Sequence, residues 1–169
     1  MNILKNKKYK DLPIIIGVGR GDLRKKIVKE LKIKKIKINW GKYISSDAKI
    51  MPNVIIDEGS VVLKGCIINN DTKIGKHCHF NTGAFIDHGN IFKNYSSVGP
   101  GVKTGGNVIV GNESFIGLGS LIKNNITITS KVIIGIGSVV VKNIKKTGIY
   151  FGAPAKFKRL KKVDENYLN

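Results

Sequence analysis

The sequence has few acidic residues and few arginines. Of its 169 residues, 30 are Lys or Arg and 11 are Asp or Glu, so the formal net charge is +19. Such an excess fits an anionic partner: a nucleic acid, an acidic membrane surface or a phosphorylated ligand. The lysines are scattered, however, arginine occurs only at Arg20, Arg24 and Arg159, and no aromatic-rich nucleic-acid motif is present. We therefore favour lysines that fill solvated faces and expect no nucleic-acid partner. A basic nucleic-acid binder stays open as an alternative.

Long apolar runs are also missing. The longest, such as Ile14–Ile16, are far too short for a transmembrane helix or a secretory signal. We therefore expect no membrane insertion and a cytoplasmic protein.

Histidine and cysteine are scarce. The three histidines are His77, His79 and His88, at spacings of 2 and 9 residues and with no acidic or thiolate partner near, so we predict no metal site. The two cysteines, Cys66 and Cys78, are predicted to be small core residues in a reducing compartment.

A six-residue period runs from Ile44 to Lys145. Every sixth residue from Ile44 to Val140 is apolar, with Thr104 as the exception. The residue four places after each of these is small or β-branched, with Asn90 as the misfit. The residue directly after the apolar position is often Gly, Asn or Asp, and no residue is inserted or deleted over the run.

This period matches neither an amphipathic helix nor simple strand alternation, and it is the signature of a hexapeptide β-helix. Each hexad makes a short strand and a corner, and Gly, Asn and Asp serve corners that need unusual backbone angles. What is known of hexapeptide proteins implies a left-handed parallel coil with three hexads per turn, so residues 18 apart stack. We place the coil at residues 42–146, between a small cap at 1–41 and a tail at 147–169.

The flanking segments are predicted to close the coil. Residues 12–18 are predicted as a strand, Leu23–Lys32 as a helix with an apolar stripe, and residues 33–38 as a second strand. The glycines that follow the first strand do not have dinucleotide-binding spacing. We expect this β-α-β cap to cover the open end of the coil, and a short basic helix at residues 157–163 to close the other end.

Three segments resemble one enzyme family. They are Asn81-Thr82-Gly83-Ala84-Phe85-Ile86-Asp87-His88, the repeats from Val108 to Lys142, and Gly152-Ala153-Pro154-Ala155-Lys156. Over roughly residues 13–160 the chain is similar to the sialic acid O-acetyltransferases and sugar-nucleotide N-acetyltransferases of surface-glycan synthesis. The resemblance implies an acetyl-CoA-dependent homotrimer that acetylates an amino or hydroxyl group of a sugar or sugar nucleotide, with its sites between neighbouring coils.

The resemblance also implies site residues. His88 matches the family's general base, a role that suits an imidazole. Gly106 lies 18 residues further on and matches the amide that meets the acetyl oxygen. Leu118 and Ile136 match the path of the pantetheine arm, which we expect on the same wall as Gly106. Lys156 is assigned to cofactor binding.

Several positions depart from the family pattern. Gly89 stands where the family has Asp or Glu after the histidine, so Asp87 and Asn81 are candidate supports for the ring. Ser97, expected at the cofactor, replaces a histidine that contacts the acetyl group, and His79 lies 18 residues before it. The first half of the family's N-terminal domain has no match. A non-catalytic scaffold or binding protein derived from the family therefore stays open as an alternative.

Overall fold

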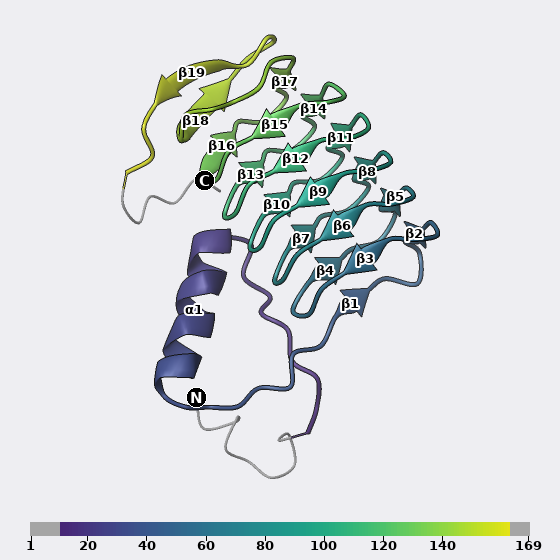
Figure 1. Ribbon diagram of the computed structural model, residues 1–169, viewed down its shortest axis with the longest axis vertical. Helices are drawn as coiled ribbons and strands as arrows, with labels where there is room; N and C mark the ends of the chain where they lie inside the picture. The colour runs from purple at the N-terminus through teal and green to yellow at the C-terminus, as the bar shows by residue number, and fades with distance from the viewer. Residues whose placement is uncertain (1–10, 163–169) are drawn as a thin grey trace.

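Three flat walls form a coil of about six turns, a left-handed parallel β-helix (Figure 1). The computed structural model describes residues 11–162. Wall 1 contains β1 (Tyr43–Ile44), β4 (Val61–Val62), β7 (His79–Phe80), β10 (Ser97–Val98), β13 (Phe115–Ile116), β16 (Val132–Ile134), β18 (Gly148–Phe151) and β19 (Lys156–Arg159). Wall 2 contains β2 (Lys49–Ile50), β5 (Ile67–Ile68), β8 (Phe85–Ile86), β11 (Lys103–Thr104), β14 (Leu121–Ile122) and β17 (Val139–Val140). Wall 3 contains β3 (Ile55–Ile56), β6 (Lys73–Ile74), β9 (Ile91–Phe92), β12 (Ile109–Val110) and β15 (Thr127–Ile128).

The register of the walls confirms the six-residue period. Ser97 pairs with His79 on one side and with Phe115 on the other, so residues 18 apart are neighbours in parallel strands. The second residue of most two-residue strands points into the coil and is almost fully buried, as Ile116 is. These strands are short because each wall must turn a corner after them. The repeated apolar position therefore makes the core.

The two misfits of the repeat are both buried. The Asn90 side-chain amide donates to the Asp87 and Gly105 carbonyls at 2.5 and 3.0 Å and accepts from the Val108 N–H at 3.1 Å. Thr104 accepts a hydrogen bond from the Asp87 N–H at 3.3 Å. A buried polar side chain is tolerated when it is hydrogen-bonded. Both misfits therefore brace the corner between walls 2 and 3.

The N-terminal segment differs from the predicted cap. Its helix α1 (Gly21–Ile33) is present, but the two predicted strands are absent from the described residues, where only a bridge joins Ile14 to Trp40. After α1, Lys35 adopts a φ of 54° and the chain turns back instead of pairing. The prediction of two strands was therefore wrong because one isolated bridge replaces a ladder.

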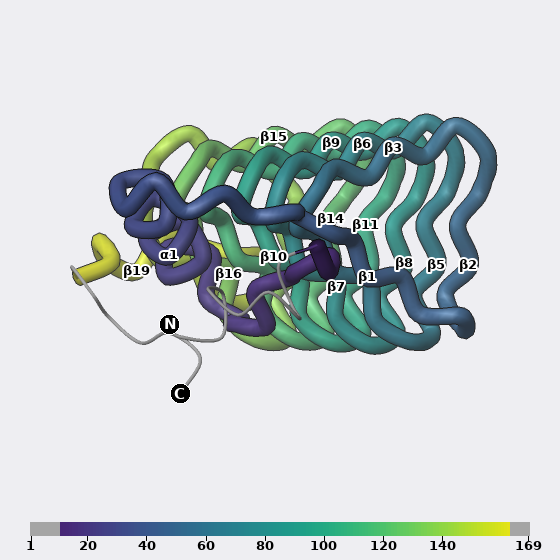
Figure 2. The backbone as a smooth tube through the Cα atoms, turned by 90° about the horizontal axis from the view of Figure 1, so that it is seen from below, coloured from purple at the N-terminus to yellow at the C-terminus, as the bar shows by residue number. Residues whose placement is uncertain are grey.

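Helix α1 also lies elsewhere than predicted. It packs beside the coil at the corner between walls 3 and 1, away from the open first turn (Figure 2). Lys25 of α1 contacts Glu113 at 2.6 Å, and the Trp40 ring meets the His77 ring edge-on at 4.7 Å. The N-terminal segment therefore covers a flank of the coil and not its end.

The predicted C-terminal helix was wrong as well. The chain leaves β18, turns, and returns as β19, which pairs antiparallel with β18 and extends wall 1. Tyr150 pairs with Phe157, and their rings pack edge-on at 5.5 Å. A strand forms because the exposed edge of wall 1 offers backbone partners. Val163, at the end of the predicted helix, lies outside the described residues.

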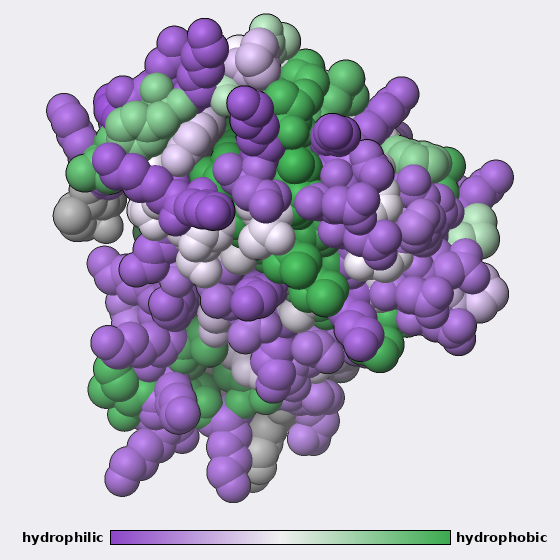
Figure 3. All heavy atoms as spheres, turned by 45° about the horizontal axis from the view of Figure 1, so that its top comes forward, coloured by the Kyte–Doolittle hydropathy of each residue, from purple (hydrophilic) through white to green (hydrophobic). Residues whose placement is uncertain are grey.

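Charge and apolar surface are distributed unevenly. Hydrophilic residues cover most of the face in Figure 3, and an apolar band runs through its centre. Within residues 11–162 no helix has the length and apolar character needed to cross a bilayer.

Candidate active site

The predicted base lies at the corner between walls 2 and 3. His88 follows β8 and is exposed, whereas Gly106, one turn further, is buried. A Cβ atom added to Gly106 would lie 2.6–2.7 Å from His88 Cε1 and Nε2, so the imidazole sits directly over the glycine. The Gly106 N–H donates to no acceptor among the described residues. This corner therefore presents an accessible imidazole beside a free backbone donor.

The carboxylate of Asp87 supports the backbone of this corner. Its Oδ1 accepts the His88 backbone N–H at 2.7 Å and the Asn69 side-chain amide at 3.2 Å. Asp87 therefore fixes the turn that carries His88 and makes no printed contact with the ring. The prediction that Asp87 supports the site holds here only as a backbone contact.

Gly89 follows His88 in the left-handed region, with φ of 65°. Asn107 and Asn125 occupy the equivalent positions of the next two turns with φ of 57° and 58°. This corner therefore accepts asparagine, a residue that tolerates positive φ. A Cβ at Gly89 would meet the Asn107 side-chain oxygen, which is the movable end of that residue.

A second cluster lies on wall 1. A pocket of about 300 Å³, here called the wall-1 pocket, is lined by Gly19, His79, Asn81, Ser97, Val98, Gly99, Pro100, Phe115, Leu118 and Ile136. Asn81 accepts the Thr82 N–H through its side-chain oxygen at 2.9 Å, so its NH₂ group is the end left to donate. Leu118 and Ile136 are 52% and 75% exposed. Their apolar surface is therefore available to a ligand or another chain.

Arg24 of α1 holds this pocket together and is fully buried. Its Nε donates to the His77 carbonyl at 2.8 Å, and Nη1 donates to the Val18 and Gly19 carbonyls at 2.8 and 2.7 Å. Its Nη2 donates to the Ser97 hydroxyl at 2.7 Å. Charge-assisted hydrogen bonds of this kind are stronger than neutral ones. The guanidinium therefore ties the loop that borders the pocket to two coil strands and engages Ser97.

His79 lies next to this arginine and is held neutral. Burial, together with the positive charge of Arg24, lowers the pKa of His79 to about 3. The ring makes a hydrogen bond with the Ile16 carbonyl, while its Nε2 is buried without a partner. A group with so low a pKa is a poor general base near neutral pH. The structure therefore separates His79 chemically from the exposed His88.

No family model matches the sequence. Comparison with solved structures gives strong similarities. A perosamine N-acetyltransferase variant from Caulobacter crescentus, in complex with CoA and GDP-perosamine, is 30% identical, with 92% of this chain and 72% of that chain covered and a TM-score of 0.84. The chain belongs to the hexapeptide-repeat sugar acyltransferase family.

Two other members give the same result. The acetyltransferase domain of PglB from Neisseria gonorrhoeae, in complex with acetyl coenzyme A, is 27% identical over 93% of this chain and 76% of that chain, with a TM-score of 0.86. WeeI from Acinetobacter baumannii is 25% identical over 89% and 75%, with a TM-score of 0.79.

The structure divides the residues that the family resemblance brought together. His88, Asp87 and Gly106 lie at the corner between walls 2 and 3, whereas Leu118 and Ile136 lie at the corner between walls 1 and 2. The expectation that all of them share one wall was wrong, because Leu118 follows Gly106 by 12 residues, which is two-thirds of a turn. One chain of this acyltransferase family member therefore carries two half-sites.

The remaining assignments fall outside both half-sites. Lys156 begins β19 and is exposed at the C-terminal end of the coil. His77 lies under Trp40 and Tyr95, and no group of three or more His, Cys, Asp or Glu in residues 11–162 is placed to hold a metal ion.

Sequence reasoning missed the role of Arg24. The helix was predicted from the apolar stripe of Ile27, Val28 and Leu31, and Arg24 lies one turn before this stripe on the same face. A cation on the inward face of an amphipathic helix was the available signal. What could not be read from the sequence is that coil carbonyls end at the place where this arginine arrives.

Proposed function

We propose that this protein transfers an acetyl group from acetyl-CoA to an amino or hydroxyl group of a sugar carried on a nucleotide. The observation that supports this most is the His88 imidazole over Gly106, whose N–H has no acceptor in the described residues. The bound ligands of the relatives, CoA with GDP-perosamine and acetyl coenzyme A, point to the same pair of substrates.

His88 is the base in this reaction. It accepts the proton from the acceptor's amine or hydroxyl as that group attacks the thioester carbonyl carbon. The Gly106 N–H donates to the carbonyl oxygen as negative charge develops on it. The carbon–sulfur bond then breaks and the thiolate leaves. Asp87 keeps His88 in place through its backbone N–H.

The two half-sites support a homotrimer. The His88 corner of one chain meets the Leu118 and Ile136 corner of the next, so that a pantetheine arm lies between the chains. Wall 2 joins these two corners, and closed threefold symmetry then turns it toward the axis. Its outward side chains are largely apolar, which suits a buried interface; they include Ile67, Phe85, Leu121 and Val139.

In this arrangement the wall-1 pocket receives the acetyl end of the donor. Ser97 and Asn81 line it, and His79 presents a neutral acceptor nearby. Lys156 lies at the C-terminal end of the coil, where it meets the far end of the donor. We place the reaction in the cytoplasm, in surface-glycan synthesis, with residues 42–146 as the catalytic coil.

Acetyl transfer to a panel of nucleotide-linked amino and hydroxy sugars tests this function, with sizing of the purified protein alongside. We expect transfer by the parent and a trimer. A monomer in dilute solution would leave the two half-sites apart and contradict the mechanism.

A non-catalytic family member is the second candidate. Gly89 in place of an acid, and the Ser97 hydroxyl already engaged by Arg24, favour it. Binding of acetyl-CoA without transfer to any acceptor on the panel would support this alternative.

A further inference from the structure

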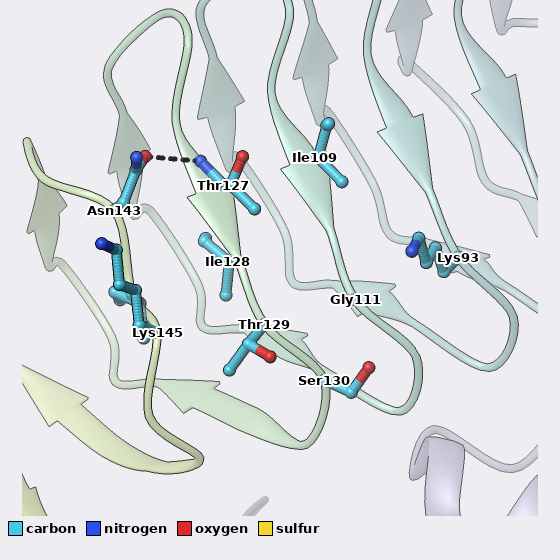
Figure 4. Close-up of a pocket in the computed structure, with 10 residues that line it drawn as sticks. Lys93, Ile109, Gly111, Thr127, Ile128, Thr129, Ser130, Asn143 and Lys145 are labelled. Carbon is cyan, nitrogen blue, oxygen red and sulfur yellow. Dashed lines mark hydrogen bonds between the residues drawn. The ribbon is translucent and has the colours of Figure 1, made fainter.

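The largest described hollow lies on wall 3, outside both half-sites. It has a volume of about 490 Å³ and follows two columns of stacked residues (Figure 4). One column runs from Lys93 through Gly111 and Thr129 to Lys145, and the second runs from Ile109 through Thr127 to Asn143. We call this hollow the wall-3 pocket.

Gly111 creates the hollow. Lys93 and Thr129, one turn before and one turn after it, carry outward side chains, whereas Gly111 has none. A Cβ there would lie 2.4 Å from the Ser130 nitrogen, so the packing of the next turn excludes a larger residue. The gap in the column is therefore built into the coil.

Two lysines border the gap at opposite ends. Lys93 and Lys145 are three strand steps apart, roughly 14 Å at ~4.8 Å per step, and both are exposed. Neither makes a printed ion pair, and no carboxylate lines the pocket. Both ammonium groups therefore remain available to an anion.

Polar side chains between the lysines add hydrogen-bond donors. The Asn143 side-chain oxygen accepts the Thr127 N–H at 2.8 Å, which leaves its NH₂ group to donate into the pocket. Ser130 accepts the Asn112 N–H at 3.0 Å, so its hydroxyl proton is also free to be donated. Thr127 and Thr129 contribute two further hydroxyls. Donors of this kind, with lysines, recognise phosphate oxygens.

We propose that the wall-3 pocket binds the phosphates of a nucleotide, with the base or ribose on the apolar surface of Ile109. The nucleotide belongs either to the 3′-phosphorylated adenosine end of coenzyme A or to the nucleoside diphosphate of the acceptor. This choice of ligands rests on the proposed function. Ile109 follows Gly106 by three residues, so the pocket begins beside the His88 corner and extends toward the C-terminal turns.

Calorimetric titration of the full chain tests the proposal. The probes are adenosine 3′,5′-bisphosphate for the donor and GDP for the acceptor, at one fixed salt concentration. The variants are Lys93→Gln and Lys145→Gln, and the control is Lys26→Gln, which removes the same charge from an exposed position of α1. We expect each pocket variant to bind one probe roughly 10-fold more weakly, the loss of one charge-assisted contact, while the control binds like the parent.

The outcomes separate the two ligands and the two proposals. Weakening confined to the bisphosphate assigns the pocket to the donor, and weakening confined to GDP assigns it to the acceptor. Equal weakening in Lys26→Gln would mean attraction by net charge alone and would overturn the pocket, as would a parent that binds neither probe. His88→Ala should bind the probes like the parent, so a failure of acetyl transfer does not count against the pocket.

Discussion

Two histidines, nine residues apart in the sequence, meet opposite environments in the structure. His88 stands exposed at a corner above Gly106, whereas His79 lies on wall 1 beneath the N-terminal segment and beside Arg24. The first has access to solvent and substrate, and the second is held neutral by burial and a neighbouring cation. The comparison teaches that position in the coil, and not residue type, decides which imidazole can move a proton.

The largest expected effect breaks the comparison at His88. We expect His88→Ala to reduce acetyl transfer by roughly 10²–10⁴-fold, the usual loss of a general base, with acetyl-CoA affinity retained. His79→Ala is the matched control, and it should leave most of the turnover because its pKa of about 3 unfits it as a base. Steady-state rates of both variants check this. A larger loss in His79→Ala than in His88→Ala would reverse the assignment.

The next effect concerns the arginine that separates the two environments. Arg24→Met should lower the free energy of unfolding by about 3 kcal/mol or more, because even two buried carbonyls left without a donor cost about 1–3 kcal/mol each. Urea denaturation measures this, with Lys26→Met as an exposed control expected to change stability by less than about 0.5 kcal/mol. Equal stability of the two variants would show that Arg24 holds nothing in place.

The pH dependence of stability sharpens the comparison. His79 has a folded-state pKa near 3 and a reference value of 6.5, so the unfolded chain binds the extra proton between these values. Stability is then fully present above pH 6.5 and falls as the pH is lowered toward 3, by about 2 kcal/mol at pH 5 (~1.36 kcal/mol per unit). Burial also lowers the pKa of His77 and adds to this slope.

Urea titrations at pH 7 and pH 5 measure the difference. His79→Gln should lose stability less steeply than the parent between these two pH values. A parent and a variant with the same slope would mean that His79 titrates normally in the folded state.

The smallest effect adds the acid that the corner lacks. Gly89→Glu places a carboxylate after His88, and we expect the rate of acetyl transfer to rise severalfold because a neighbouring negative charge makes an imidazole more basic. Gly89→Asn is the control, since Asn107 and Asn125 show that the corner accepts asparagine. Rates for both variants that fall equally below the parent would show that any side chain here disturbs the base.

The repeat predicted more of the fold than of the site. Strict spacing by 18 predicts that His88 lies over Gly106, and the structure places it there. The same rule, applied to Leu118, should have placed it on another corner, and the error came from following the family resemblance instead. The flanks failed for a different reason: whether residues 33–38 or 157–160 form a strand depends on a free sheet edge, and only β19 meets one.

The absence of inserted residues between Ile44 and Lys145 makes the coil a measure of length. Each added turn of 18 residues would lengthen the molecule by one strand spacing, ~4.8 Å, without altering any other turn. The span from His88 to Lys145 is therefore set by counting turns. A chain with one more turn between Gly111 and Thr129 would suit a ligand longer by that increment, and one with a turn removed would suit a shorter ligand.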